Sequence, residues 1–433
     1  MKYFFILGNN PTLSIAEISA VFELNNVADR TGQCPAPTLM ENVLILETNQ
    51  KFDAQDLIKK LGGTIKIGEI ADDAVETRQC LVSESFPSDD NQTRHCLVST
   101  DDYINEIKKI IETKIKNETP TAKYNFGISN YTNRNINTKI IGMELKTWLK
   151  EKNISCRFVV SQEKTLSSVV VEQNKLLKSG VEIVILPEGK LGYTLAVQPF
   201  KELSFRDYGR PARDDLSGML PPKLAQIMIN LAVAPFIKGG EGIPSDDFVI
   251  LDPFCGSGTI LTEAMLMGFQ NLIGSDLSRK AINDTEKNID WVQKKFLTTN
   301  SQIPNIQLHN ISAPQLSQKI QPNSIDLIAT EPYLGPQRGK IDLPKIIGEL
   351  TALYSAGLKE FFKVLKPGGR VVMVWPVWED KFFLNPNLNG FKIAKSIPES
   401  LRNNPAIKLT ARQTIIYGRP GQKVWREIVV LTK

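Results

Sequence analysis

Three groups of residues in the second half of this 433-residue chain have the types and spacing of a nucleotide-dependent active site. The first is DPFCGSGT at 252–259, which follows an apolar run typical of a buried strand. The second is Asp276, 20 residues after Gly256. The third is Glu331-Pro332-Tyr333, at the end of the apolar run 325–330. Together they predict a cofactor pocket with an acidic turn beside it.

The loop at 252–259 has the composition of a cofactor-binding turn. Gly256 and Gly258 allow a ligand to approach the backbone, and the helix expected after them supplies free N–H groups and positive potential. No lysine follows the glycines, which excludes a P-loop, and the third glycine of the nicotinamide fingerprint is absent. A carboxylate at Asp276 can accept hydrogen bonds from both ribose hydroxyls.

The remaining residue types exclude much other chemistry. There are two histidines, and the five cysteines are scattered without a C-x-x-C pair, so we expect no metal centre, disulfide framework or histidine triad. No residue set offers redox chemistry. S-adenosylmethionine (SAM) needs no activation, because its sulfonium already makes the methyl group electrophilic and the enzyme only orients a nucleophile. SAM is therefore the favoured cofactor.

The elements that must position these residues alternate between strand and helix after residue 247, as in a doubly wound α/β sheet. An antiparallel hairpin, 411–418 and 423–431, closes this part and is usual for Rossmann-like methyltransferases. The expected strands are 248–252, 271–275, 306–309, 325–330 and 370–375.

The first half of the chain predicts two smaller α/β modules. Residues 1–70 indicate β-α-β-α-β, with Ser14 and Glu17 interpreted as a capping box that starts a helix. Residues 103–198 indicate two helices and several strands, with 168–172 as an extended piece. Between the modules, TRQCLVS at 77–83 is nearly repeated as TRHCLVS at 93–99. We interpret this as an inserted duplication rather than as a metal site.

The distribution of charge bears on the kind of binding partner, and the hydropathy of the chain bears on its location. The net charge is +5, and the basic residues concentrate in 101–180 and 201–433, which suits a polyanion but also an ordinary solvated surface. In the segment 199–221, Arg206, Arg210 and Arg213 could contact phosphate or pair with neighbouring aspartates. No apolar stretch is long enough to cross a membrane and no signal peptide is recognised, so a cytoplasmic location is expected.

These motifs resemble a known family, the THUMP-domain tRNA guanosine-N2 methyltransferases. The resemblance includes DPFCGSGT, FFILGNNPTLSIAEI, LGGTIKIGEI and RDYGRPARDDLSGMLPPKLAQIMINLA, and covers nearly the whole chain except 76–99. It implies an α/β protein with a Rossmann-like class I methyltransferase domain behind an N-terminal ferredoxin-like module and a tRNA-gripping THUMP domain. The implied segments are 1–75 (ferredoxin-like), 76–99 (insert), 100–198 (THUMP), 199–221 (linker) and 222–433 (methyltransferase).

The resemblance also implies roles for individual residues. For SAM these are Asp252, Phe254, Gly256, Gly258, Thr259, Asp276, Leu277 and Ser312. For catalysis they are Glu331, Pro332 and Tyr333. Two sites depart from the common pattern. In the Asp-Pro-Pro-Tyr turn, Glu331 stands for the aspartate, Tyr333 for the second proline and Leu334 for the aromatic. After the third strand, Ser312 stands for an acidic residue.

The implied reaction transfers a methyl group from SAM to the N2 amine of a tRNA guanosine, at position ten. The Glu331 carboxylate and the Pro332 carbonyl would accept the amine hydrogens, and Tyr333 would stack on the extruded base. Two alternatives stay open: an adenine-N6 methyltransferase, and an inactive RNA-binding homologue. The sequence also leaves open whether an accessory protein subunit is required.

Overall fold

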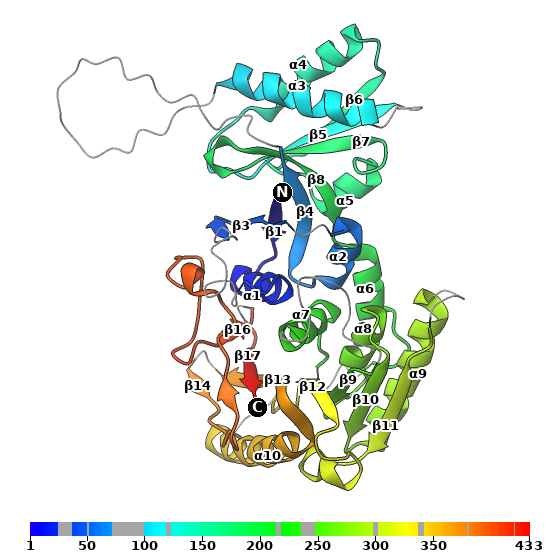
Figure 1. Cartoon of the computed structure of the whole chain (residues 1–433), viewed down its shortest axis with the longest axis vertical. Coiled ribbons are helices and arrows are strands. Elements are labelled where there is room, and N and C mark those ends of the chain that lie inside the picture. Colours follow the sequence, from blue (N-terminus) through cyan, green and yellow to red (C-terminus); the bar gives the residue numbers. More distant parts are fainter. Residues whose placement is uncertain are drawn as a thin grey trace, which may run out of the picture. The chain divides into compact units, whose positions relative to one another are not determined.

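The computed structural model describes most of the chain as two compact units (Figure 1). The first unit consists of residues 1–6, 38–58 and 65–198, and the second of 7–37, 59–64 and 199–433. The duplicated segment 76–99 lies outside the described residues, apart from Ser99. The described residues are 1–24, 37–49, 52–71, 99–117, 123–213, 218–234, 247–297, 302–336, 342–378, 381–419 and 421–433.

The first unit is built on an eight-stranded sheet in the order β2-β3-β1-β4-β8-β7-β5-β6. Its strands are β1 (Lys2–Leu7), β2 (Thr38–Met40), β3 (Val43–Glu47), β4 (Thr64–Ile70), β5 (Tyr124–Asn130), β6 (Cys156–Val159), β7 (Gly180–Ile185) and β8 (Leu191–Val197). Its helices are α2 (Ala54–Lys60), α3 (Thr100–Asn117), α4 (Thr138–Glu151), α5 (Ser168–Gln173) and the 3-10 turn η2 (Pro187–Gly189). Apolar residues at helical spacing, such as Ile107 and Ile111 of α3, are fully buried in its core.

Two local predictions in the N-terminal half are wrong. The piece at 168–172, expected to be extended, is helix α5, because the Ser167 hydroxyl caps it by accepting the Val170 N–H at 3.3 Å. Ser14 and Glu17 do not form a capping box. Helix α1 (Pro11–Val21) begins three residues earlier than Ser14, with Asn10 as its N-cap and proline in its first turn.

The second unit contains the sheet expected for a Rossmann-like methyltransferase. Its strands run β11-β10-β9-β12-β13-β17-β15, with β14 on β13 and β16 on β17. Strand β13 pairs in parallel with β12 but antiparallel with β17, from Arg370–Thr432 to Trp378–Val424, which confirms the antiparallel closure. The bounds are β9 (Val249–Asp252), β10 (Asn271–Asp276), β11 (Asn305–Asn310), β12 (Ile325–Thr330), β13 (Leu365–Trp378), β14 (Phe382–Phe383), β15 (Lys392–Ile393), β16 (Ile415–Tyr417) and β17 (Val424–Thr432).

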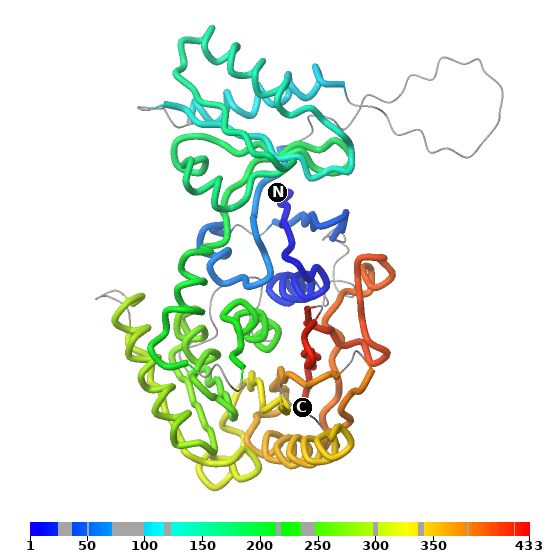
Figure 2. The backbone as a smooth tube through the Cα atoms, turned by 180° about the vertical axis from the view of Figure 1, so that it is seen from behind, coloured from blue at the N-terminus to red at the C-terminus, as the bar shows by residue number. Residues whose placement is uncertain are grey.

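Helices cover both faces of this second sheet (Figures 1 and 2). Helix α7 contacts β12, β13 and β17, while α8 and α9 contact β10, and these three helices form one layer. Helix α10 lies on the other side of the sheet, packed on η3. The bounds are α6 (Phe200–Tyr208), α7 (Pro222–Val233), α8 (Thr259–Leu266), α9 (Arg279–Phe296), α10 (Leu343–Val364), η3 (Ala313–Gln318) and η4 (Glu399–Leu401).

Helix α1 belongs to the same unit as this sheet and packs on α7. Its Glu17 is fully buried and accepts the N–H groups of Gly62 and Gly63 at 2.9 and 2.8 Å. Asn230 of α7 donates a third hydrogen bond at 2.7 Å. Burial raises the pKa of Glu17 to about 7, although these hydrogen bonds oppose the shift.

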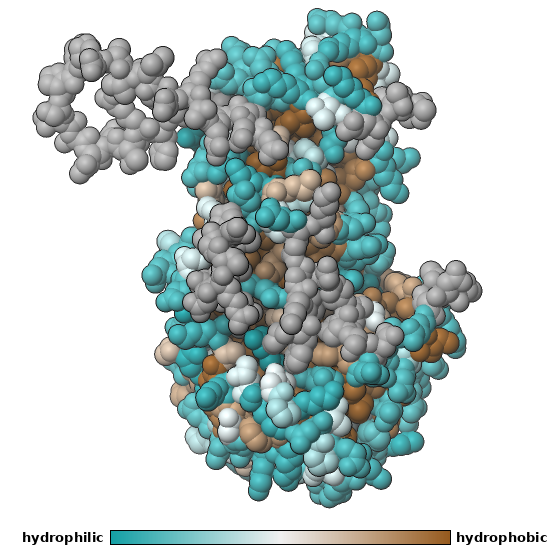
Figure 3. All heavy atoms as spheres, in the orientation of Figure 1, coloured by the Kyte–Doolittle hydropathy of each residue, from teal (hydrophilic) through white to brown (hydrophobic). Residues whose placement is uncertain are grey.

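Hydrophilic side chains cover most of the described surface seen in Figure 3, with hydrophobic residues in small groups. Among the helices that the structure describes, none combines the length and apolarity that a bilayer crossing requires.

Candidate active site

The loop after β9 has the open backbone that a cofactor requires. Gly256 lies at φ +54°, and a Cβ there would meet no atom within 4 Å. Gly258, at φ +83°, is the N-cap residue just before helix α8, and a Cβ there would come within 2.8 Å of Thr285. Both glycines therefore hold conformations that other residues adopt only at a cost, and Gly256 leaves space above the loop.

Asp276 and the glycine loop are brought together, as the sequence predicts. One carboxylate oxygen of Asp276 accepts the Gly256 N–H at 3.1 Å, and the other accepts the Ser278 N–H at 2.8 Å. Asn310, at the end of β11, donates to the backbone oxygens of Asp276 and Leu277 at 3.0 and 2.8 Å. Leu277, the next residue in the chain, is 75% exposed.

Asp252 is the most buried acid of the site. It is 2% exposed and accepts hydrogen bonds from the Thr330 hydroxyl at 2.7 Å and the Phe254 N–H at 3.2 Å. Burial raises the pKa of Asp252 to about 7. The negative charges of Asp276 and Glu331 also raise it, whereas the two hydrogen bonds lower it. The carboxylates at the ends of β10 and β12 therefore act on the one at the end of β9 between them, and this concentration of acids favours a cationic ligand.

Glu331 is held at the end of β12 by a partner that sequence reasoning missed. The Arg426 guanidinium, on β17, donates to both carboxylate oxygens at 2.5 and 3.1 Å. The two side chains are only 12% and 13% exposed, so the pair is mostly shielded from water. Burial lowers the pKa of Arg426, but the Glu331 carboxylate outweighs it, and the net shift is upward.

The turn after Glu331 is fixed by a buried tyrosine of α10. Tyr354, which is 0% exposed, donates its hydroxyl to the Tyr333 carbonyl at 2.8 Å. Pro332 is buried, whereas the Tyr333 ring is 52% exposed. The aromatic side chain is thus accessible while its backbone is fixed, an arrangement that suits stacking on a planar ligand.

Ser312 follows β11, half-buried, as the residue that precedes η3. Its hydroxyl does not cap that turn. Ser312 thus follows the strand next to β10, where the resemblance places an acidic residue, and it carries no charge.

The arginines of the segment 199–221 make contacts within the fold. Arg206 is buried and donates to both oxygens of Glu263 at 2.7 and 3.0 Å. Arg210, also buried, donates to the Thr259 hydroxyl at 2.6 Å. Arg213 donates to two backbone carbonyls, of residues 207 and 208, at 3.2 and 3.0 Å. Intramolecular pairing therefore applies to both buried arginines. Arg210 also pairs with the neighbouring Asp207, at 3.6 Å, as one of the two expectations had it, whereas the acid that Arg206 binds is the distant Glu263.

Two ion-pair partners, Arg426 and Glu263, were not predicted from the sequence, although each is weakly marked in it. Arg426 is a cation in the middle of the apolar strand KVWREIVVL, and Glu263 is an acid in the apolar helix TILTEAML. A charged residue inside a buried element needs a partner, but the sequence does not say which one.

Comparison with known proteins agrees with this geometry. Residues 244–429 match a family model described as "Methyltransferase domain". Two relatives are both named tRNA (guanine(10)-N2)-dimethyltransferase. The one from Methanothermobacter thermautotrophicus is 29% identical over 38% of this chain and 40% of its own length. The one from Methanocaldococcus jannaschii is 27% identical over 48% of this chain and 52% of its own length. The chain thus spans about half the length of these relatives.

Among solved structures, TrmN from Thermus thermophilus aligns over 100% of both chains, with 16% identity and a TM-score of 0.48. The strand order of the second unit and the family match confirm the Rossmann-like methyltransferase part of the expected fold, and the named relatives confirm the resemblance to tRNA guanine-N2 methyltransferases. The second half of the chain therefore has the Rossmann-like fold of SAM-dependent methyltransferases, in a protein that resembles the tRNA guanine-N2 enzymes.

Proposed function

We propose that this protein transfers a methyl group from SAM to the N2 amine of a guanosine in tRNA, at position ten. The names of the relatives support the substrate and the position. The observation that carries the proposal is the Glu331 carboxylate, which Arg426 holds at the end of β12 and whose charge acts on Asp252.

The open loop and the three carboxylates fit SAM, a cation with a ribose. We propose that Asp276 accepts the ribose hydroxyls and that Leu277 and Ser312 flank the base. The other proposed contacts are Asp252, Phe254, Gly256, Gly258 and Thr259. When bound, SAM supplies an electrophilic methyl group.

Glu331 and the Pro332 carbonyl are proposed to hold the guanine amine by its two hydrogens. The lone pair of that amine is delocalised into the ring, so orientation is what the protein contributes. A carboxylate has about four acceptor directions, and Arg426 uses two of them, which leaves capacity for an amine hydrogen. The same carboxylate stabilises the positive charge that the amine gains and accepts its released proton.

Recognition of the rest of the RNA is proposed to lie in the N-terminal half. Residues 100–198 would act as the THUMP domain, after the ferredoxin-like module 1–75 and the insert 76–99. Residues 199–221 would link it to the methyltransferase domain 222–433. Of the three linker arginines, only Arg213 is not buried, so it is the candidate for phosphate contact. A tRNA substrate would place the protein in the cytoplasm.

The test is methyl transfer from labelled SAM to unmodified tRNA, followed by mass spectrometry of the nucleosides. We expect methylated guanosine at position ten from the wild type, a loss of at least about 100-fold in Glu331→Ala, and wild-type turnover in Glu349→Ala, whose side chain is 59% exposed on α10. Methyladenosine as the product would replace this proposal with the adenine-N6 alternative. Absence of SAM binding in calorimetry would support the inactive homologue.

A further inference from the structure

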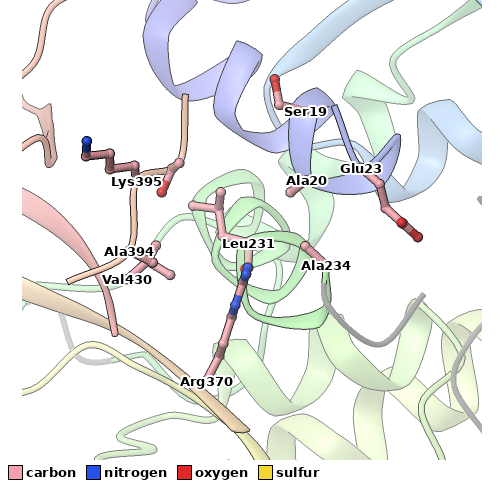
Figure 4. A pocket seen from close by; sticks show the side chains of 10 residues that line it. Ser19, Ala20, Glu23, Leu231, Ala234, Arg370, Ala394, Lys395 and Val430 are labelled. Carbon is pink, nitrogen blue, oxygen red and sulfur yellow. The ribbon is translucent and has the colours of Figure 1, made fainter. Parts of the chain in front are cut away.

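A cavity of about 40 Å³ opens between α1, α7 and the strands β13 and β17 (Figure 4). The Arg370 guanidinium extends from β13 toward Leu231 and donates to its carbonyl, near the end of α7, at 3.3 Å. The Ser19 hydroxyl and the Lys395 ammonium both point away from Arg370. Because these polar groups do not converge on one point, we assign no ligand to this cavity.

Two side chains of α9 hold the cofactor loop, although neither is among the residues predicted from the sequence. Asn288 is 2% exposed, and its Nδ2 donates to the Ser257 carbonyl of the loop at 2.8 Å. About one turn earlier, the Thr285 hydroxyl donates to the Gly256 carbonyl at 2.8 Å. Residues three apart in a helix lie on one face, so a single face of α9 binds two consecutive carbonyls of the loop.

Asn288 also binds the segment 199–213, which precedes the loop in the sequence. Its Oδ1 accepts the Ala212 N–H at 3.0 Å, and its Nδ2 donates to the Ala212 carbonyl at 2.9 Å. With the bond to Ser257, both amide hydrogens and the amide oxygen are in use. The opposite orientation of the amide would place its oxygen against two carbonyl oxygens, so the contacts determine the orientation. One buried side chain therefore joins α9, the cofactor loop and the segment 199–213.

A second contact connects the same segment to the start of α8. Arg210 is 6% exposed, and its Nη1 donates to the Thr259 hydroxyl at 2.6 Å. Thr259 is the first residue of α8 and follows Gly258 directly. The Arg210 Nε donates to the Arg206 carbonyl at 3.0 Å, which fixes the guanidinium within the segment. The segment therefore contacts the loop region at Thr259 directly, and at Ser257 through Asn288.

The turn 256–258 depends on such partners because two of its three residues are glycines. Gly256 and Gly258 lie at φ +54° and +83°, and glycine has few steric limits, so the Ser257 peptide between them can turn in several directions. A helix N-terminus attracts a ligand through its N–H groups and positive potential, which a carbonyl turned toward that ligand would oppose. The bonds from α9 instead keep the Gly256 and Ser257 carbonyls turned toward α9.

We propose that Asn288 is a positioning residue for SAM. By fixing the Ser257 peptide against the segment 199–213, it keeps the glycine loop in the conformation that binds the cofactor. This role rests on SAM as the cofactor of the proposed function and is independent of the nucleotide that receives the methyl group. It also makes the segment 199–213, which the sequence predicts only as a linker, a supporting part of the cofactor site.

The main experiment measures SAM binding to the full chain by calorimetry, without RNA. Asn288→Asp has nearly the same shape, but a carboxylate cannot donate to the Ser257 and Ala212 carbonyls and is repelled by both. We expect its Kd for SAM to rise by at least about tenfold, because the loop occupies its binding conformation for a smaller fraction of the time. Asn283→Asp makes the same change at an exposed position of α9 and should bind SAM as the wild type does.

The same titration separates positioning from a general loss of stability. If Asn288 only stabilises the fold, its variants should contain fewer binding-competent molecules, each with the wild-type Kd. Positioning instead predicts a raised Kd with a stoichiometry near one. In turnover assays the KM for SAM should rise by the same factor, whereas the KM for tRNA should change by less than about twofold. Asn288→Ala, which introduces no charge, should give the same pattern if Asn288→Asp folds poorly.

Thr285 provides a test at the neighbouring carbonyl. Thr285→Val removes the hydroxyl and should weaken SAM binding by about fivefold, and Thr285→Ser, which keeps the hydroxyl, should recover most of the affinity. A wild-type Kd in both Asn288 variants would overturn this inference and leave the proposed function intact. Absence of SAM binding in the wild type would overturn both.

Discussion

Arg426 and Glu331, 95 residues apart in the sequence, form a two-point ion pair that joins the ends of β12 and β17. The pair lies mostly out of solvent, so its geometry is fixed more firmly than that of a surface salt bridge. It places the proposed catalytic carboxylate in one orientation and leaves part of its acceptor capacity unused. Arg426 is thus a positioning residue for the proposed reaction.

Replacing Arg426 with Met should lower kcat by about 100-fold, because Glu331 loses both the bonds that orient it. Arg426→Lys should recover only part of this, since an ammonium cannot make the two-point contact. Turnover is measured by methyl transfer to tRNA, and SAM affinity by calorimetry. A purely structural role predicts parallel losses of SAM binding and turnover, whereas positioning predicts that SAM binding is kept.

The elevated pKa of Asp252 predicts that SAM binding depends on pH. The pKa is about 7 in the free protein, and a bound cation favours the ionised form, so binding should release protons below that pH. Affinity should therefore rise from pH 5.5 to about 7.5 and then level off. Calorimetry in buffers of different ionisation enthalpy counts the protons. Asp252→Asn should bind SAM more weakly and lose this part of the pH dependence, and an unchanged profile in that variant would exclude Asp252 as its source.

The buried Glu17 predicts a stability effect without a direct effect on the cofactor site. Glu17→Ala would leave the Gly62 and Gly63 N–H groups unpaired, so the free energy of unfolding should fall by about 2–4 kcal/mol. Glu286→Ala, an exposed acid of α9, should change it by less than about 0.5 kcal/mol. Chemical denaturation measures both, and equal effects in the two variants would contradict this prediction.

The same residue also predicts a direction for the pH dependence of stability. The folded pKa of Glu17 is raised to about 7 from 4.5, so ionisation opposes folding. Its contribution should be most favourable below about pH 4.5 and should decrease as the pH rises to 7. Asp252 shifts in the same direction. The slope of stability against pH should therefore become smaller in Glu17→Gln and smaller again in the double variant with Asp252→Asn.

The hydrogen bond from Tyr354 to the turn should matter less for catalysis than the ion pair between Arg426 and Glu331. Tyr354→Phe removes the hydrogen bond to the Tyr333 carbonyl but keeps the ring in the core, so kcat/KM for tRNA should fall by about tenfold. SAM affinity should stay unchanged. Tyr208→Phe, at a side chain that is 69% exposed, is the control for loss of a hydroxyl. If Tyr354→Phe has wild-type kinetics, the bond does not position the turn.

Local sequence signals were sufficient to predict the sheet of the second unit and the proximity of the glycine loop to Asp276. The strands of the second unit follow from apolar runs that alternate with helical patterns, and Gly256, Gly258 and Asp276 are predicted from residue type and spacing alone. Each of these features is determined by residues close to it in the sequence, within one strand or one strand-turn-helix unit. The capping-box interpretation of Ser14 and Glu17 failed for the opposite reason: Glu17 binds backbone groups about 45 residues away.

The sequence by itself determined that the second half is a doubly wound methyltransferase-like domain with an acidic turn after its fourth strand. Only the tertiary structure decided which charges meet: Arg426 with Glu331, Arg206 with Glu263, and Arg370 with no carboxylate at all among the described residues. The physical reason is that periodicity and turn chemistry are local, whereas the partner of a buried charge is set by how distant strands and helices pack.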